Sequence, residues 1–183
     1  LNGTAHLGDG RVITNAAIGF ENGSLTLVAD ATTIRLDKSK FEVLDCSGKQ
    51  IYPGFIAPNT VLGLVEVEAI RATRDNAETG SLNPNVRSII SYNTDSKVTP
   101  TVRCNGILTA QIVPQGGLLS GQSSVVKLDA WNWEDAAYAA DHGIHLNMPS
   151  LLARSGGRGG FAAFFNPQPA GDPVKRALEQ VAS

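Results

Sequence analysis

Charge, cysteine and methionine are all scarce in this sequence of 183 residues. Charged residues make up 17% of it, against about 25% in typical soluble domains, and 15 basic against 17 acidic residues leave a net charge of −2. A nearly neutral chain has no electrostatic footprint for nucleic acid or for an anionic membrane surface. No run approaches the ~20 apolar residues of a membrane-spanning helix. We therefore expect neither a nucleic acid nor a membrane as partner.

The two cysteines, Cys46 and Cys104, lie too far apart for a Cys-x-x-Cys motif. A zinc knuckle, a thioredoxin-like redox site and a disulfide-rich small fold are therefore excluded. The chain begins at Leu1 and its one methionine is Met148, which predicts a processed or trimmed N-terminus. A signal peptide could have preceded it, so the compartment stays open between the cytoplasm and a periplasmic or secreted location.

Glycine and proline are plentiful by contrast, and they favour short elements over a helical bundle. In the first fifty residues Asn22-Gly23 stands between two apolar runs, which predicts a tight β-hairpin. Alternating apolar residues at 41–46 predict a further strand before a turn at Ser47-Gly48. We expect residues 1–52 to form a small β-sheet, or half-sandwich, domain.

The pattern changes at Pro53-Gly54. Buried strands are predicted at 55–58, 107–113 and 124–128, a further strand at 144–148, and an exposed polar excursion at 71–85. Helical segments are predicted at 85–92 and from Asp172 to the end. A further helix is predicted between Thr99 as its N-cap and Gly106 as its C-terminal cap. Another is predicted over 133–141, with Asn132 as its N-cap. Strands that alternate with capped helices predict βα units and a mostly parallel sheet after residue 53.

Three stretches carry a family pattern: Asn2-Gly3-Thr4 with the hairpin after it, Tyr52-Pro53-Gly54-Phe55-Ile56, and Asn105-Gly106-Ile107-Leu108-Thr109-Ala110. Together they resemble the N-terminal half of the amidohydrolase superfamily, particularly its imidazolonepropionase-like members. The resemblance implies an α/β fold, with the N-terminal part of a TIM-like (β/α)8 barrel over 53–183. It also implies that 1–52 is the β-sheet segment of a composite sandwich, and that the complete protein is a metal-dependent hydrolase of C–N bonds.

The metal motif of that family is altered here. The resemblance implies P-G-[FL]-[IV]-D-x-H-x-H, in which alternate residues at the strand's end place two imidazoles beside one metal. This chain has Ala57, Asn59 and Val61 at the aspartate and the two histidines. The zinc or other divalent metal that the family implies lacks its first pair of ligands. We therefore nominate no metal ligand and no catalytic residue.

A barrel of this kind carries its functional groups at the carboxyl ends of its strands. That position nominates Asn59 after the first strand, Gln111 near the end of the second and His145 at the end of a later one as residues that bind a small-molecule substrate. His142 and His145 are three apart, but Gly143 indicates a helix end between them, so we expect no shared metal.

Two further patterns carry less weight. The loop 154–160 is rich in glycine and arginine but lacks the Lys-Ser/Thr of a phosphate-binding loop, so we interpret it as a surface loop or as a loop over a barrel mouth. Trp131, Trp133 and Tyr138 lie near helical spacing, which favours a role in packing. His6 has no partner in view.

Two function classes stay open. The first is an amidohydrolase that cleaves C–N bonds in linear or cyclic amides when complete. The second is a non-catalytic homologue that serves as a binding or assembly subunit, and a bare structural fragment is a third reading. Residues 53–183 hold about half of the ~250 residues of a barrel, so open strand edges and an apolar face would remain. We expect a second polypeptide, or the remaining C-terminal half, to complete the barrel, or else self-association.

Overall fold

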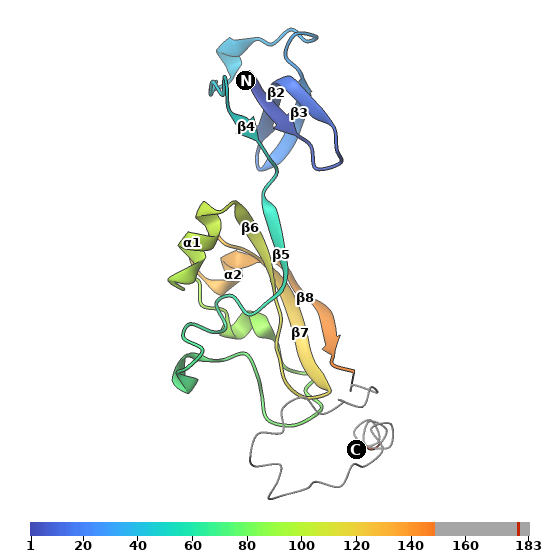
Figure 1. The fold of residues 1–183 in the computed structure, drawn as a ribbon, viewed down its shortest axis with the longest axis vertical. Coiled ribbons are helices and arrows are strands. Elements are labelled where there is room, and N and C mark those ends of the chain that lie inside the picture. The colour runs from blue at the N-terminus through green and yellow to red at the C-terminus, as the bar shows by residue number, and fades with distance from the viewer. Residues whose placement is uncertain (149–178, 180–183) are drawn as a thin grey trace, which may run out of the picture. The chain divides into compact units, whose positions relative to one another are not determined.

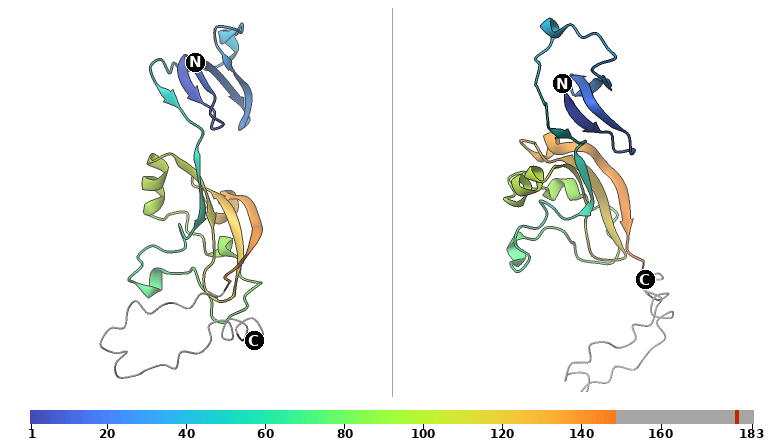
Figure 2. Two further views of the ribbon diagram at one scale, coloured as in Figure 1. Left: turned by 45° about the vertical axis from the view of Figure 1, so that its right-hand side comes forward. Right: turned by 45° about the horizontal axis from the view of Figure 1, so that its top comes forward.

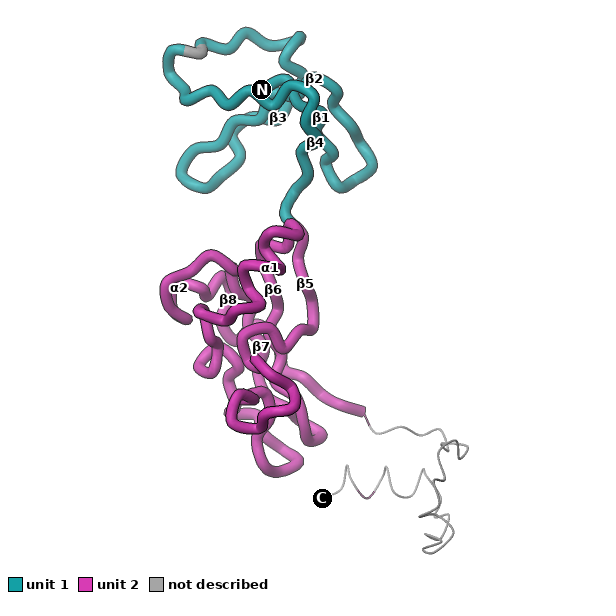
Figure 3. Tube along the Cα trace, turned by 60° about the vertical axis from the view of Figure 1, so that its left-hand side comes forward, with its two compact units in different colours: residues 1–54 teal, residues 55–183 magenta. Residues whose placement is uncertain are grey.

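The computed structural model describes residues 1–148 and residue 179. The chain divides into two compact units, Leu1–Gly54 and Phe55–Ser183, drawn in two colours in Figure 3. Each unit contains one four-stranded sheet. None of the described helices is long and apolar enough to cross a membrane. The glycine-rich loop at 154–160 and the helix expected from Asp172 lie outside the described residues.

The sheet of the N-terminal unit has the strand order β3-β2-β1-β4. Its elements are β1 (Gly3–His6), β2 (Val12–Glu21), β3 (Ser24–Asp30), the 3-10 turn η1 (Lys38–Lys40) and β4 (Gln50–Ile51). Strand β1 is antiparallel to β2 and parallel to β4. The small side chains Ala5, Ala16 and Ala17 are its buried apolar residues.

The Asn22-Gly23 hairpin is confirmed. Glu21 lies opposite Ser24, and Asn22 and Gly23 have φ values of +50° and +76°. A two-residue hairpin turn of this hand needs positive φ at both positions, which these two residue types tolerate best. The strand predicted at 41–46 is wrong, because that segment forms no strand pairing. Its end is held instead by single bonds, such as Asn2 Nδ2 to Asp45 Oδ1 at 3.0 Å.

The sheet of the C-terminal unit has the order β5-β6-β7-β8 (Figure 1). Its strands are β5 (Phe55–Thr60), β6 (Ile107–Ile112), β7 (Leu119–Lys127) and β8 (Ala137–Leu146). The helical elements are η2 (Arg71–Thr73), η3 (Ser88–Ser91), α1 (Val98–Cys104) and α2 (Trp133–Ala136).

The prediction of a mostly parallel sheet is wrong. Strands β5 and β6 are parallel and connected through α1, as expected of a βα unit, but β7 is antiparallel to both β6 and β8. A parallel return needs a crossover of a dozen or more residues, and only residues 113–118 separate β6 from β7. The described strands form a mixed open sheet, which does not confirm a partial barrel.

The expected helices are shorter than predicted. Asn132 is the N-cap of α2, and its side chain accepts from the Asp135 N–H at 2.7 Å, but the helix ends at Ala136 instead of Asp141. The residues that follow pair with β7 and become β8. Helix α1 begins at Val98, so Thr99 lies inside it rather than at the N-cap. Two helical turns were expected at 85–92, and the structure has one 3-10 turn, η3.

The core of the C-terminal unit lies on one face of the sheet, where α1, α2 and η3 contribute to it. Figure 2 shows α1 and the excursion between β5 and α1 on the same side of the strands. The buried members are Leu64, Ile89, Tyr92, Ala110, Ile112, Val126, Leu128 and Ala136. Side chains alternate along a strand, so Thr109 and Gln111 lie on the other face, with Ile56 paired to Thr109. Ile56 is 66% exposed, which corrects the expectation of a buried strand at 55–58.

The excursion expected to be exposed at 71–85 is partly built into the sheet. Asn76 is buried, and Leu82 and Arg87 form parallel bridges with Leu119 and Gln122 of β7. The excursion and β7 lie close together at Gly121, whose φ is +124°. A Cβ atom at this position would lie 2.6 Å from the Val86 carbonyl oxygen. Only glycine fits at this position.

Candidate functional site

One row of hydrogen bonds crosses all four strands of the C-terminal sheet. The Asn59 N–H of β5 donates to Gln111 Oε1 of β6 at 3.4 Å, and Gln111 Nε2 donates to Ser123 Oγ of β7 at 3.2 Å. The Ser123 hydroxyl in turn donates to the Gly143 carbonyl of β8 at 3.3 Å. We call these four residues the polar row. Bonds of this length are weaker than average, so a ligand that offers shorter ones can replace them.

A local irregularity in β5 starts the row. Asn59 has a φ of +51°, and the register between β5 and β6 shifts between Ala57 and Thr60. Asparagine is among the few residue types that tolerate this left-handed conformation. The resulting bulge leaves the Asn59 N–H outside the regular ladder, where it meets the Gln111 side chain.

The three residues nominated from the sequence lie at one end of the sheet. Strand β7 is antiparallel to β6 and β8, so β5, β6 and β8 run in the same direction. Asn59, Gln111 and His145 each lie close to the carboxyl end of one of these strands. The structure brings Asn59 and Gln111 into contact. His145 lies two positions beyond Gly143, so it is on the same face of β8 as the polar row.

Sequence reasoning missed Ser123, although it connects Gln111 to β8. It is fully buried, as is its neighbour Ser124, which lies on the opposite face and accepts from the Asp141 N–H at 2.9 Å. The two serines precede a Val-Val run that reads as an ordinary strand. Their burial depends on the pairing with β6 and β8, for which the sequence carries no local signal.

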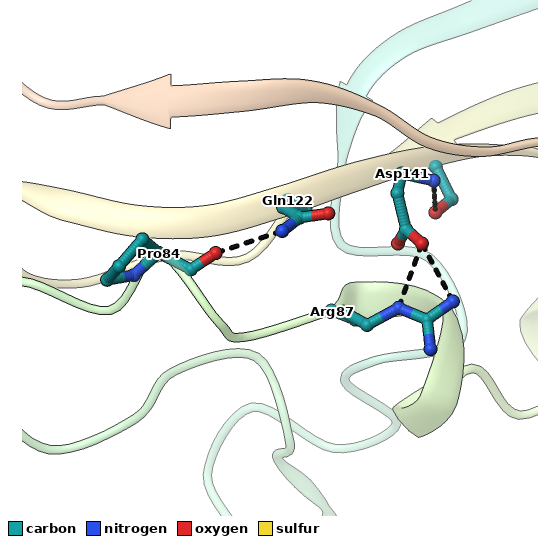
Figure 4. A network of polar contacts seen from close by, with 5 residues as sticks. Pro84, Arg87, Gln122 and Asp141 are labelled. Atoms are coloured by element: carbon teal, nitrogen blue, oxygen red, sulfur yellow. Dashed lines mark hydrogen bonds and ion pairs between the residues drawn. The ribbon is translucent and has the colours of Figure 1, made fainter.

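An ion pair between Arg87 and Asp141 joins the segment before η3 to β8 (Figure 4). Arg87 approaches Asp141 Oδ2 with Nε at 2.9 Å and Nη2 at 2.7 Å. The hydrogen bond and the charge of Asp141 raise the pKa of Arg87, so the guanidinium stays charged. Gln122 Nε2 donates to the Pro84 carbonyl at 3.0 Å. These contacts fix the excursion to β7 and β8 and so hold the strands that carry the polar row.

The positions that correspond to the family's metal motif lie in different surroundings. Ala57 and Val61 pack against the core cluster, whereas Asn59 is exposed. Neither apolar side chain offers a ligand atom, and an amide oxygen of Asn59 is the one donor that remains. In residues 1–148 no group of three His, Cys, Asp or Glu side chains lies close enough together to hold a metal ion.

The remaining candidates lie apart from the polar row. His142 is exposed on β8, three residues from His145 and so on the other face. His6 stacks on Tyr52 in the N-terminal unit, with ring centroids 4.4 Å apart. Trp133 packs against the core as expected, but Trp131 is 90% exposed and Tyr138 is 75% exposed, so the packing role predicted for these two is wrong.

Comparison with known proteins gives one negative result and two similarities. No family model matches the sequence. Over 51 residues the chain is 45% identical to the imidazolonepropionases of Bacillus thuringiensis (strain Al Hakam) and Bacillus cereus (strain AH187), which is 28% of this chain and 12% of each of those proteins. The fold is similar to the crystal structure of an amidohydrolase from Thermotoga maritima MSB8, with a TM-score of 0.72 and 22% identity over 79% of this chain and 37% of that one.

The sequence similarity to imidazolonepropionases and the structural similarity to an amidohydrolase both support the relationship to the amidohydrolase superfamily that the sequence motifs indicate. The structural likeness, at 22% identity, shows a shared fold. The chain spans about a third of the structural neighbour, and its match covers about an eighth of the curated relatives.

Proposed function

We propose that this chain is part of an amidohydrolase-like protein that hydrolyses non-peptide C–N bonds in small linear or cyclic amides when complete. The observation that carries the proposal is the fold shared with an amidohydrolase over 79% of the chain. The similarity to imidazolonepropionases over 51 residues supports it independently.

The described residues do not fit the divalent metal that this family implies. Ala57 and Val61 have no ligand atom, and Val61 packs against the core cluster, so an imidazole there would have to displace apolar neighbours. We therefore route no catalytic step through residues 1–148. The groups that activate water and move protons would come from the rest of the complete protein.

The role proposed for this chain is to bind and orient the substrate at the polar row. Gln111 uses one amide hydrogen and its oxygen within the row, which leaves a second N–H for a ligand. The Asn59 side chain and the His145 ring add donors and acceptors at the same end of the sheet. An amide substrate carries both a carbonyl acceptor and N–H donors, so it matches this set.

The sheet that carries the row also presents apolar side chains to solvent. Phe55 and Ile56 of the outer strand β5 are 58% and 66% exposed, and β5 and β8 are the two outer strands of the described sheet. We propose that a second polypeptide, or the remaining half of the protein, covers this surface, and that self-association does so in its absence.

A second candidate function is that of a non-catalytic homologue that acts as a binding or assembly subunit. It is favoured by the residues at the metal-motif positions, Ala57, Asn59 and Val61. Both candidate functions are compatible with the same fold and the same polar row. They differ in whether the complete protein contains a metal ion and hydrolyses a substrate.

Metal analysis combined with an activity screen on the full-length protein separates the two. The hydrolase requires about one zinc or comparable ion per chain and turnover of at least one member of a panel of linear and cyclic amides. A full-length protein that retains no metal after purification in zinc-containing buffer, and that hydrolyses no member of the panel with or without added metal, would favour the subunit.

A further inference from the structure

An open cavity of about 470 Å³ lies where β5 ends, between the turn that follows it and helix α1. This volume is within the range of about 300–1,000 Å³ that is usual for small-molecule sites. The cavity lies beyond the polar row along the chain, since Thr60 lines it and Asn59 does not. It is not used by the function proposed above.

Part of the cavity lining is apolar. It is formed by Val61, Leu62 and Val65 from the segment after β5 and by Val98 and Val102 from α1. Val98 is 42% exposed, so part of this surface is open to solvent. A branched aliphatic side chain of a ligand would be shielded from water here.

Two carboxylates, Glu66 and Glu68, line the cavity, and Glu66 is the one that neighbouring donors hold in place. Asn93 Nδ2 donates to Glu66 Oε1 and the hydroxyl of Ser96 donates to Glu66 Oε2, each at 3.0 Å. Ser96 is itself 2% exposed. Both donors are neutral, so they orient the carboxylate without compensating its charge, and each oxygen keeps a second lone pair for a cation.

Arg74 places a positive charge in the same cavity. It lies opposite Val65 in an antiparallel bridge, so the two side chains share a face of this turn. The hydroxyl of its neighbour Thr73 lies 2.9 Å from the carbonyl oxygens of both Val67 and Ile70, and its single proton is shared between these two acceptors. Within the ranges that the structure describes, the Arg74 guanidinium forms no ion pair with Glu66 or with any other carboxylate.

An oriented carboxylate and a guanidinium that do not pair with each other, beside apolar side chains, suit a ligand with the complementary arrangement, and Glu68 adds a second negative charge to the lining. We propose that this cavity binds a small zwitterion with an apolar side chain, of the size of an α-amino acid or a dipeptide. The ammonium group binds Glu66, the carboxylate binds the guanidinium of Arg74, and the side chain packs on the valines that line the cavity. Arginine suits the carboxylate because its planar fork donates two parallel hydrogen bonds.

The test is calorimetric titration of the 183-residue chain with L-leucine and with leucyl-leucine, which separates the two ligand sizes. L-Leucinamide lacks the carboxylate and 4-methylpentanoate lacks the ammonium group, so these two probes report on each charge. We expect saturable binding of at least one zwitterion and at least tenfold weaker binding of both truncated probes.

Variants assign the two charges. Arg74→Gln should weaken binding of the zwitterion at least tenfold and leave L-leucinamide unaffected, whereas Arg71→Gln, on an exposed arginine outside the cavity, should change neither. Glu66→Gln should weaken binding of the zwitterion and leave the binding of 4-methylpentanoate unchanged. If Glu66→Gln fails to fold, the probes and Arg74→Gln decide alone. Absence of saturable binding up to millimolar concentrations, or equal affinity of wild type and Arg74→Gln, would overturn the proposal.

Discussion

The side chain of Gln111 donates to the Ser123 hydroxyl at 3.2 Å, and this bond joins β6 to β7 at the centre of the polar row. Ser123 is fully buried, and its hydroxyl also donates to the Gly143 carbonyl, so removal of the glutamine would leave it with one of its two partners. The bond therefore connects the stability of the sheet to a residue that we propose binds the substrate.

Replacing Gln111 with alanine should lower the free energy of unfolding by about 1–2 kcal/mol, because a buried hydroxyl and the Asn59 N–H each lose a partner. Urea denaturation followed by circular dichroism measures the change. Thr109→Val is the matched control, since Thr109 lies on the same face of β6 and its hydroxyl has no bond in the described hydrogen-bond network. Equal loss in the two variants would contradict the role assigned to the row.

The ion pair between Arg87 and Asp141 should show a favourable coupling energy in a double-mutant cycle with alanine, and this energy should decrease as salt is added. The two side chains are 42% and 27% exposed. Arg103 and Asp129 form the control pair, at 39% and 83% exposure. We expect the control cycle to give the smaller coupling, because its carboxylate is almost fully solvated. The reverse order would contradict this account.

The N-terminal unit should lose stability in acid. Asp30, Asp37 and Asp45 each accept hydrogen bonds from the backbone N–H and the hydroxyl of the Ser or Thr two residues later. These bonds, those of the hydroxyl first, lower the pKa of each carboxyl. A lowered pKa contributes stability that is present above the unfolded value of about 3.9 and is lost as the pH falls through the folded value.

We therefore expect the amides of the N-terminal unit to exchange faster with solvent below about pH 4, after correction for intrinsic rates. Asp45→Asn keeps an acceptor oxygen but cannot titrate, so it should weaken this acid dependence. Glu42→Gln, at an exposed glutamate with no described side-chain bond, should leave it unchanged. The prediction is wrong if Asp45→Asn has the acid profile of wild type.

The 183-residue chain should self-associate when it is alone in solution, and Ile56→Lys should shift it towards monomer. Ile56 is 66% exposed on an outer strand, where a lysine opposes pairing with a second chain. Light scattering combined with mass spectrometry measures the state. Val67→Lys replaces an exposed residue of the loop after β5, away from the strands, and should have little effect. A monodisperse wild-type monomer with a cooperative melt would refute the prediction.

Titration of the chain with Zn²⁺ should show no tight stoichiometric binding at positions 57, 59 and 61. Restoring aspartate and two histidines there in the full-length protein should raise its metal content, at a cost in stability because Val61 packs against the core cluster. Val65→His, which adds an imidazole outside the motif, is the control. Unchanged metal content in the restored variant would show that the motif is wrongly aligned.

The predictions of local structure that are confirmed are those that depend on neighbouring residues alone. Asn22-Gly23 specifies its turn through backbone conformation alone, and the cap at Asn132 needs only the N–H of Asp135. The end of α2 was not predictable in this way, because residues 137–141 leave the helix in order to pair with β7. The chain direction of β7 and β8 likewise depends on connections too short for a parallel crossover.

The same distinction applies to the site. Placing Asn59, Gln111 and His145 at strand ends required only the strand limits, and the structure puts all three at one end of the sheet. Whether they contact a substrate stays a prediction. Ser123 and the charges in the cavity were not foreseen, because each depends on residues that are distant in sequence, such as Ser96 for Glu66.

The bridges between segment 82–87 and β7 change what a shortened version of this protein could look like. Removing residues 80–87 resembles trimming a surface loop, yet Leu119 and Gln122 donate their N–H groups to the carbonyls of Ser81 and Val86. A deletion would leave those amides without acceptors and would expose a strip of backbone between two glycines, Gly117 and Gly121. Any relative that lacks the excursion must therefore cover the first half of β7 with another segment, so insertions and deletions here should occur together with changes at these two glycines.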